Sequence, residues 1–367
     1  MVSGSLLAGW FAPLAVYLAI LILHLALPAR RVDGYALDPG TGQPLTYRLN
    51  GLVVFALVTS VWLAAGWKGW ISWDWLYVNR WSAMGGACLV GLAYSLITVL
   101  GAPPTGRSLL ADLYLGRPEN PQHFNKRVDA KMFLYLAGAV LLGLNTLSAT
   151  AFHAGALGSA SNPGVYLHAA LLTFFVLDYL VFERVHLYTY DLFAERVGLK
   201  LGWGCLAFYP FFYPVGLWGT AHLGKPSVIA DLGWIWLALS ALVFLSGWVL
   251  ARGANLQKYV FKRFPERAFL GRFPPRVIHG GNLALLCGGF WGVARHVNYL
   301  GEILMATGLA MSLGHLDSPW PWLYPLYYLA LLVPRERDDD RRCAEKYGTL
   351  WDEYRRRVPY RIVPRIY

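Results

Sequence analysis

The sequence is poor in charged residues. Of its 367 residues, only 14% are Asp, Glu, Lys or Arg, whereas 56% are hydrophobic and the mean hydropathy is +0.41. A soluble globular chain carries about 25% charged residues. This shortage excludes an ordinary soluble domain and indicates that lipid surrounds much of the chain.

Cysteine is scarce, and so is charge near the N-terminus. The four cysteines are far apart and none belongs to a C-x-x-C pair, which predicts neither a disulfide framework nor a metal site. No charged residue precedes Arg30, so the first apolar run lacks the basic region of a signal peptide. We therefore interpret residues 6–27 as a retained membrane helix.

Apolar runs of membrane-spanning length recur along the chain. The stretch 301–333 is broken by glycine and proline, which predicts a hairpin of two helices. Residues 282–293 are apolar but too short to cross a bilayer. The predicted fold is all-α: a polytopic integral membrane protein with about ten membrane-embedded helices. The other predicted helices lie near 6–27, 51–67, 83–101, 132–152, 164–183, 202–222 and 230–251.

The basic residues are distributed unevenly between the predicted loops. The formal net charge is +11. With the N-terminus outside, 29 of the 32 Lys and Arg residues fall on the inside, leaving only Lys68, Arg80 and Lys225 outside. This agrees with the positive-inside rule and predicts a cytoplasmic C-terminus. The basic charge therefore reflects membrane topology, and nucleic acid is not expected as a partner.

The polar chemistry is concentrated in the last third of the chain. We predict a transmembrane bundle at 1–251 and a catalytic region at 252–367, integrated into one domain. A phosphorylated dinucleotide needs cations for its phosphates, polar groups for its ribose and nicotinamide, and an aromatic surface. No G-x-G-x-x-G follows a predicted strand, so a Rossmann domain is not expected.

The residue types that such a ligand needs are present. The candidate cations are Lys258, Lys262, Arg263, Arg335 and Lys346; the polar partners are Asn255, Gln257, Asn298 and Asp339; the rings are Trp291, Tyr299 and Tyr347. A simpler interpretation stays open, because basic residues beside membrane helices also fix topology or bind anionic lipid. In that interpretation His296 is structural, Trp291 is an interfacial anchor and Cys343 is a packing residue.

Three segments of this region resemble the signatures of the sterol reductases. They are Arg252-x-x-Asn-x-Gln-Lys, Gly289-Phe-Trp-Gly-x-x-Arg-His-x-Asn-Tyr-x-Gly301, and Cys343-x-x-Lys-Tyr-Gly followed by Val358-Pro-Tyr-Arg-Ile-x-Pro364. The family includes the Δ14-sterol, 7-dehydrocholesterol and C24(28) reductases and the membrane domain of the lamin B receptor. The Δ14 members are the most similar. Pro334 and Asp338 depart from the family's pattern.

The resemblance implies an NADPH pocket, a sterol substrate that enters from the bilayer, and saturation of a ring carbon–carbon double bond, with Δ14 favoured. Membrane lipid is the other expected partner, and the oligomeric state stays open. The residues implied at the cofactor are Asn255, Gln257, Lys258, Lys262, Trp291, Arg295, His296, Asn298, Tyr299, Arg335, Asp339, Cys343, Lys346 and Tyr347.

The implied mechanism protonates the alkene and adds hydride to the resulting cation. An acid for this step needs a desolvated site, because burial keeps its proton in place near neutral pH. Asp178 and Glu183 stand in or beside an apolar run, where ionisable residues are functional candidates; alternatively, Glu183 pairs with Arg184. The full candidate set is Asp178, Glu183, Asp191, Tyr179, Tyr299 and Glu302.

Several other functions stay open at this point. Reduction of the Δ7 or C24(28) bond is one. An integral-membrane methyltransferase of the isoprenylcysteine type, which uses S-adenosylmethionine, is another, although such enzymes lack the Trp-Gly element. A non-enzymatic sterol-binding membrane protein is the third. The short N-terminal segment favours a bacterial inner membrane over the endoplasmic reticulum.

Overall fold

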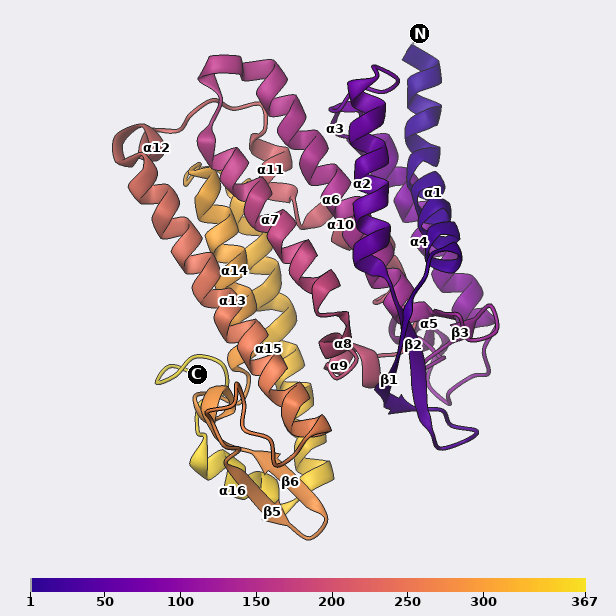
Figure 1. The fold of residues 1–367 in the computed structure, drawn as a ribbon, viewed down its shortest axis with the longest axis vertical. Coiled ribbons are helices and arrows are strands. Elements are labelled where there is room, and N and C mark those ends of the chain that lie inside the picture. Colours follow the sequence, from indigo (N-terminus) through magenta and orange to yellow (C-terminus); the bar gives the residue numbers. More distant parts are fainter. Residues whose placement is uncertain (1) are drawn as a thin grey trace. The chain divides into compact units, whose positions relative to one another are not determined.

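The computed structural model describes the backbone of residues 2–367 and the side chains from Leu7 onward. The chain divides into two compact units, Met1–Pro226 and Ser227–Tyr367, coloured indigo to rose and rose to yellow in Figure 1. The functional division at residue 252 stays a prediction, and that residue lies within one continuous helix.

The first unit is built from helices and two small hairpins. Its helices are α1 (Val2–Ala26), α2 (Gly51–Trp67), α3 (Trp75–Val78), α4 (Arg80–Leu100), α5 (Leu109–Leu115), α6 (Ala130–Leu157), η1 (Gly158–Ala160), α7 (Pro163–Val181), α8 (Glu183–His186), α9 (Tyr190–Phe193), η2 (Gly204–Phe208), α10 (Tyr209–Phe212) and α11 (Val215–Thr220). Its strands are β1 (Arg30–Leu37), β2 (Pro44–Leu49), β3 (Gln122–His123) and β4 (Val128–Asp129).

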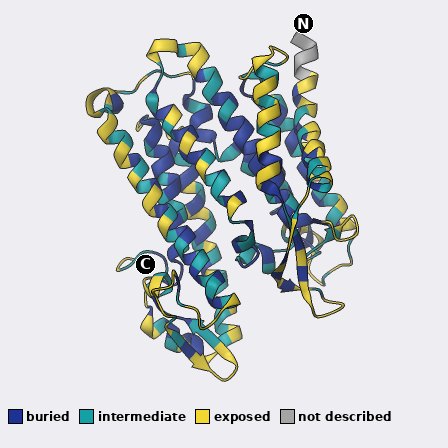
Figure 2. Cartoon of the chain, in the orientation of Figure 1, coloured by how far each residue is buried: buried dark blue, intermediate teal, exposed yellow. Residues whose placement is uncertain are grey.

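Helix α6 forms the centre of the first unit. Most of its side chains are buried (Figure 2), and α1, α2, α3, α7 and α10 all contact it. Asp129 begins the helix: its side chain accepts a hydrogen bond from the N–H of Met132 at 3.0 Å. A carboxylate at this position satisfies a backbone donor and suits the helix dipole.

The hairpins are a structural feature that the sequence prediction lacked. β1 pairs with β2 in antiparallel register, from Arg30 opposite Leu49 to Leu37 opposite Pro44. Along β1, side chains alternate between exposed and buried from Arg31 onward, with Val32 and Ala36 facing inward. This period of two is the pattern of a half-buried strand. The β1–β2 hairpin lies between two long apolar runs. These runs dominate the hydropathy profile, so the short strand pattern was overlooked.

The predicted helix at 202–222 is wrong as a single span. The segment consists of the π-helical η2 and the short helices α10 and α11. Pro214 has no N–H to continue the ladder, and the chain turns at Tyr213 and Pro214 before α11 begins. A helical stretch at 202–212 with a π-helical middle, followed by a turn and α11, therefore replaces one long helix.

The second unit contains six helical segments, of which α13, α14 and α15 are the longest, and one hairpin. They are α12 (Ser227–Leu232), α13 (Trp234–Arg263), β5 (Val277–Gly280), β6 (Leu283–Leu286), η3 (Gly289–Gly292), α14 (Val297–Leu313), α15 (Pro319–Tyr347) and α16 (Thr349–Arg357). Helix α13 extends twelve residues past the predicted end at 251. The predicted hairpin at 301–333 is confirmed: Gly314, at φ +75°, ends α14 and α15 follows.

Helices α13 and α14 pack closely because glycines line their contact. A Cβ on Gly301 would come within 2.5 Å of the carbonyl oxygen of Gly247. A Cβ on Gly308 would come within 2.6 Å of the backbone nitrogen of Phe244. Small residues at such contacts let two helix backbones approach each other, as is common inside membranes.

Helix α15 has one buried face that changes chemistry along its length. Its buried residues recur every three or four positions, which is the repeat of a single helix face. The first members are apolar or aromatic and the last two are acidic: Pro321, Tyr324, Pro325, Tyr328, Leu332, Glu336 and Asp340. The same face therefore packs in its first half and carries buried carboxylates in its second.

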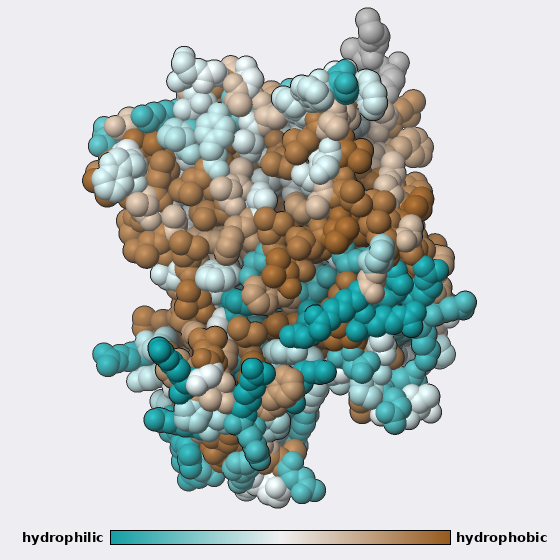
Figure 3. Space-filling view, in the orientation of Figure 1, coloured by the Kyte–Doolittle hydropathy of each residue, from teal (hydrophilic) through white to brown (hydrophobic). Residues whose placement is uncertain are grey.

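The outer surface of the long helices is apolar. Five helices are long and apolar enough to cross a membrane in the part of the chain that is described: Leu7–Ala26, Arg80–Leu100, Ala130–Ala160, Pro163–Val181 and Trp234–Arg263, with Gly51–Trp67 and Val297–Leu313 as shorter apolar helices. Figure 3 shows hydrophobic side chains gathered over long helices. The all-α membrane fold is confirmed; the count of about ten stays a prediction.

Candidate functional site

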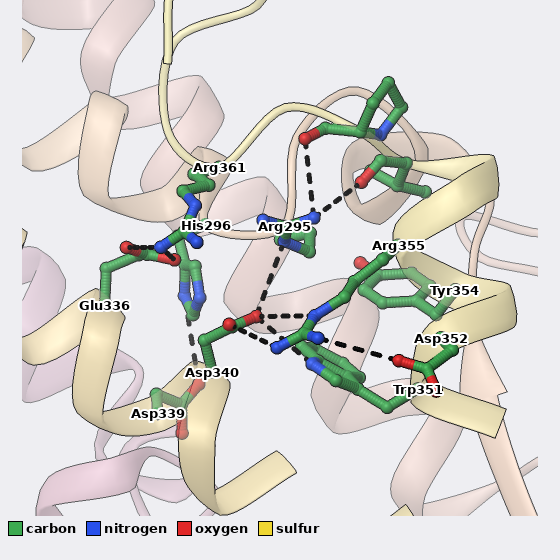
Figure 4. Close-up of polar contacts among 12 residues, drawn as sticks. Arg295, His296, Glu336, Asp339, Asp340, Trp351, Asp352, Tyr354, Arg355 and Arg361 are labelled. Carbon is green, nitrogen blue, oxygen red and sulfur yellow. Dashed lines mark hydrogen bonds and ion pairs between the residues drawn. The ribbon is translucent and has the colours of Figure 1, made fainter. Parts of the chain in front are cut away.

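The second half of α15 carries three carboxylates on one side. Glu336, Asp339 and Asp340 are separated by three and four residues, so their side chains lie close on the helix surface. Figure 4 shows them facing Arg295 and His296, which directly precede α14, and the C-terminal segment. The site is thus built from α15, α16, the residues directly before α14 and the segment after α16.

Glu336 is fully buried and holds the end of the chain. Its carboxylate accepts hydrogen bonds from Nη1 of Arg361 at 3.0 and 3.2 Å and from the hydroxyl of Tyr367 at 3.3 Å. Arg361 is also the residue whose carbonyl accepts a bond from the N–H of His296 at 2.8 Å. The final residues are therefore tied to the start of α14 and to α15.

Asp340 is the centre of a second set of contacts. It accepts hydrogen bonds from Nη2 of Arg355 at 2.5 Å and from the indole N–H of Trp351 at 3.1 Å, and Nε of Arg295 lies 3.9 Å away. Burial alone would raise the pKa of Asp340, but the hydrogen bond and charge of Arg355 outweigh it and hold that pKa below its ordinary value. Asp340 is thus a structural anion.

Arg295 is positioned by carbonyl oxygens. Its Nη1 donates to the carbonyls of Val358 and Pro359 at 3.3 and 3.4 Å, and its backbone N–H donates to the carbonyl of Tyr360 at 2.9 Å. Together with Asp340, these acceptors surround a guanidinium that is almost fully buried. Arg295 therefore joins α15 to the segment after α16.

His296 lies between a carboxylate and an aromatic ring. Its Nδ1 is 3.9 Å from Oδ2 of Asp339, and its ring stacks on Tyr299 at 4.9 Å between centroids. Burial, reinforced by the charges of Arg295 and Lys258, lowers the pKa of His296 to about 3, so the ring is neutral at pH 7. Its Nε2 and Oδ1 of Asn298 are buried polar atoms that hydrogen-bond to no described residue.

The loop before α14 is attached to α13. Gln257 accepts a hydrogen bond from the N–H of Phe290 at 3.0 Å and donates to the carbonyl of Gly288 at 3.1 Å. The indole N–H of Trp291 donates to the carbonyl of Ala254 at 2.9 Å, and Nζ of Lys258 lies 5.6 Å from the Trp291 ring centroid. Gln257 and Trp291 thus fix η3, and Lys258 lies beside them.

The other predicted cofactor residues also lie in the second unit. Asn255 and Lys262 are half-buried on α13, Arg335 and Cys343 are half-buried on α15, and Lys346 is exposed with Nζ 5.2 Å from the Tyr347 ring centroid. Burial raises the pKa of the Cys343 thiol to about 12, so this side chain is no nucleophile at neutral pH.

The candidate acids are divided between the two units. Tyr299 and Glu302 belong to α14, whereas Asp178 and Tyr179 lie on α7, Glu183 begins α8 and Asp191 lies on α9.

Among the candidate acids of the first unit, Glu183 is held by a backbone hydrogen bond. Its Oε2 accepts a hydrogen bond from the N–H of Gly51, at the start of α2, at 3.3 Å. Burial raises the pKa of Glu183 to about 7, and the Gly51 bond opposes this only in part. The hydroxyl of Tyr179 is buried and hydrogen-bonds to no described residue, and its ring lies 4.3 Å from that of His186. The predicted pairing of Glu183 with Arg184 stays a prediction.

Comparisons with known proteins identify the family. A model described as "Ergosterol biosynthesis ERG4/ERG24 family" matches residues 8–367. The chain belongs to the ERG4/ERG24 family. A "Delta(14)-sterol reductase" of Arabidopsis thaliana is 33% identical, covering 96% of this chain and 94% of that protein. One from Methylotuvimicrobium alcaliphilum is 32% identical over 100% and 83%, and one from Ascobolus immersus is 30% identical over 96% and 84%.

Membership in the ERG4/ERG24 family confirms the resemblance drawn from the three C-terminal segments. It also confirms the predicted class, a membrane-bound sterol reductase and hence an oxidoreductase of sterol and lipid metabolism. The methyltransferase alternative is therefore wrong.

The sequence prediction named no site role for four residues that the ERG4/ERG24 chain brings together. Glu336, Asp340, Arg355 and Arg361 form the ion pairs that hold the second unit's site. The spacing of the two carboxylates was the available signal, because residues four apart share a helix face. The signal was hidden by the surrounding run of charges from Arg335 to Arg342, which is typical of a solvated helix.

A buried lysine of the first unit was also missed. Lys131 is fully buried, and its Nζ donates to the carbonyl of Leu192, in α9, at 2.8 Å. Asp129, two residues earlier, is buried as well, and burial raises its pKa to about 6.

Proposed function

We propose that this chain is an NADPH-dependent Δ14-sterol reductase. The observation that carries this proposal is the likeness to proteins named Delta(14)-sterol reductase over almost its whole length, from a plant, a bacterium and a fungus. Because the likeness includes both units, it supports assigning the relatives' reaction to this chain better than a match to one segment would. A Δ7 or C24(28) specificity is the main alternative.

The residues of the second unit fit a phosphorylated dinucleotide. A nicotinamide carboxamide both donates and accepts hydrogen bonds, and the buried Nε2 of His296 and Oδ1 of Asn298 are polar atoms suited to it. Lys258, beside the Trp291 ring, supplies a cation near an aromatic surface. We propose that these residues, with Arg335 and Lys346 toward the phosphates, hold the cofactor.

The bound cofactor would supply hydride to the sterol. The chain's own residues must supply the proton and tolerate the cation that protonation creates on the substrate. Glu183, with a pKa of about 7, keeps a proton available at neutral pH. Tyr179, four residues earlier, offers a buried phenol as a relay. We propose that the acid lies within the set Asp178, Tyr179 and Glu183.

The two substrates differ in polarity and should reach the enzyme by different routes. A sterol dissolves in the bilayer and would enter laterally, whereas the phosphates of NADPH cannot cross lipid. We propose that the C-terminus faces the cytoplasm, where the cofactor is present, and that the N-terminus faces outward.

Product analysis tests the reaction and the cofactor together. The purified chain, with a sterol that carries both Δ14 and C24(28) double bonds, should yield the Δ14-saturated product with NADPH. NADH should support a much lower rate, because the 2′-phosphate adds about two negative charges that cationic side chains can bind. Saturation of only the C24(28) bond would contradict the Δ14 specificity. Equal rates with NADPH and NADH would contradict the preference for NADPH.

A further inference from the structure

A basic and aromatic loop joins α13 to β5. The segment 264–276 contains three arginines and one carboxylate, and Arg263 directly precedes it. Arg267, Arg272 and Arg276 are exposed, as are Phe264, Leu270 and Phe273. Exposed apolar side chains that gather on one segment among polar residues can mark a contact with a protein or a membrane.

The loop has a defined tip. Phe269 and Phe273 exchange backbone hydrogen bonds, N–H of Phe269 to the carbonyl of Phe273 at 2.8 Å and the reverse at 3.0 Å. Between them, Leu270 has φ +53° and is 69% exposed, and Gly271 has φ +70°. A leucine rarely adopts the left-handed conformation, and such a residue in a fully exposed position suggests a functional reason.

The loop returns along α13 toward the apolar part of that helix. The side chain of Phe269 is buried and its ring contacts that of Phe290 edge-on at 6.2 Å between centroids. Phe290 in turn lies against Gly253, where an added Cβ would come within 2.3 Å of its ring. Gly253 is ten residues before the end of α13, so the loop doubles back by about 15 Å.

The uncharged part of α13 ends next to Gly253. Residues Trp234–Ala251 include no charged side chain, and Arg252 is the first. These eighteen residues span about 27 Å, close to the thickness of the hydrocarbon core. A bilayer that covers these eighteen residues would place the buried Phe269 at the level of the headgroups and the loop tip beside the membrane surface.

The charges at the tip suit an anionic surface. Arg267 lies over the ring of Phe264 at 5.7 Å, which orients the guanidinium and aromatic side chains together. Neither Arg267 nor Arg272 forms an ion pair with a residue that the structure describes. Arginines flanking exposed apolar residues are the composition of interfacial membrane-binding segments.

We propose that the loop 264–276 binds anionic phospholipid. Leu270 and Phe273 enter the interfacial layer, and Arg267 and Arg272 bind phosphate-bearing headgroups. This site is separate from the residues assigned above to the cofactor, and it does not depend on which double bond is reduced.

The first test is lipid binding by the full-length chain in detergent. Native mass spectrometry would follow titration with phosphatidylglycerol and with phosphatidylcholine, for the unmodified chain and for R267Q/R272Q. Each arginine near an anionic surface contributes about fivefold in affinity, so the double variant should bind phosphatidylglycerol about 25-fold more weakly. Phosphatidylcholine binding should be unchanged, and inorganic phosphate should not displace the lipid.

A matched pair controls for bulk charge. Arg356 and Arg365 are exposed arginines of the same unit, so R356Q/R365Q removes the same charge elsewhere. Equal loss of lipid affinity in both double variants, or no loss in either, would overturn the proposal. Weaker NADPH binding by R267Q/R272Q with unchanged lipid binding would assign the arginines to the nucleotide and would overturn it too.

The second test addresses the tip alone. Leu270→Gly fits the left-handed conformation, so the variant should fold. Hydrogen exchange of the 264–276 backbone should be slower in phosphatidylglycerol nanodiscs than in phosphatidylcholine nanodiscs, and Leu270→Gly should remove most of that difference. Identical exchange of the unmodified loop in both lipids would refute insertion of the tip.

Discussion

Glu183 shows how one buried carboxyl couples chemistry to stability. The site raises its pKa to about 7, so the folded protein binds this proton more tightly than the unfolded chain does. The stabilisation is fully present below the carboxyl's ordinary pKa, near 4.5, and is lost as the pH rises through 7. Ionisation then leaves a negative charge beside the Gly51 N–H with little other compensation.

Glu183→Gln is therefore expected to flatten this pH dependence. Glutamine resembles the protonated acid and keeps an oxygen that can accept the Gly51 bond. The unfolding temperature of the unmodified protein in detergent should fall between pH 5 and pH 8, and that of the variant should fall less. Parallel curves for the two proteins would show that Glu183 is not the titrating group. Asp129, whose pKa is also raised, would then be the next candidate.

Asp178→Asn tests the proton path. The substitution keeps the side chain's shape and removes its acid function. If Asp178 supplies the proton or orders the group that does, turnover should fall by about tenfold or more, while NADPH binding by fluorescence titration stays within about twofold. Loss of both binding and folding would indicate a structural ion pair instead. Unchanged turnover would move the role to Glu183 or Tyr179.

At the scale of single elements, the glycine contact between α13 and α14 makes a direct prediction. Gly308→Ala places a methyl group 2.6 Å from the backbone nitrogen of Phe244, so the two helices must move apart. The expected loss of stability is about 1–3 kcal/mol, measured by unfolding in detergent. Gly155 on α6 has no atom within 4 Å of an added Cβ, so Gly155→Ala is the matched control and should not destabilise. Equal stability of both variants would argue against close packing.

Some helices could be predicted from the sequence and others could not, for physical reasons. The helix at 51–67 and the hairpin after residue 301 could be predicted because hydropathy and helix-breaking residues agreed there. The segment 202–222 could not, because its apolar composition outweighed Pro214 in a hydropathy reading. The end of α13 was placed too early, since hydropathy falls at Arg252 while the helical backbone continues to Arg263.

The candidate site shows the same limit. Short motifs identified His296, Asn298 and Lys258, but not that Gln257 and Trp291 fix a loop through backbone groups. Backbone hydrogen bonds leave no signature in side-chain composition. Their partners depend on packing between segments more than thirty residues apart, which a single sequence does not encode locally.

At the scale of the whole molecule, the distribution of basic residues predicts the orientation in the membrane. A reporter enzyme that is active only in the cytoplasm, fused after Tyr367, should be active, and one that is active only outside should not. Fusion within 68–74, between α2 and α3, should give the reverse pattern. An external signal at Tyr367 would refute the predicted orientation and, with it, cytoplasmic entry of the cofactor.

Helix α15 connects an apolar segment, which we expect to contact lipid, with the polar site. Its apolar first half and its carboxylates share one continuous helix, so Asp340 lies about 22 Å along the axis from Pro325. When the hydrocarbon layer thins or thickens, membrane helices tilt to match it. If α15 tilted as one continuous helix, Glu336 and Asp340 would be displaced. Their ion pairs with Arg361 and Arg355 would then be strained. Turnover in reconstituted bilayers should consequently peak at one acyl-chain length, whereas a flat response would indicate that the ion pairs absorb the tilt.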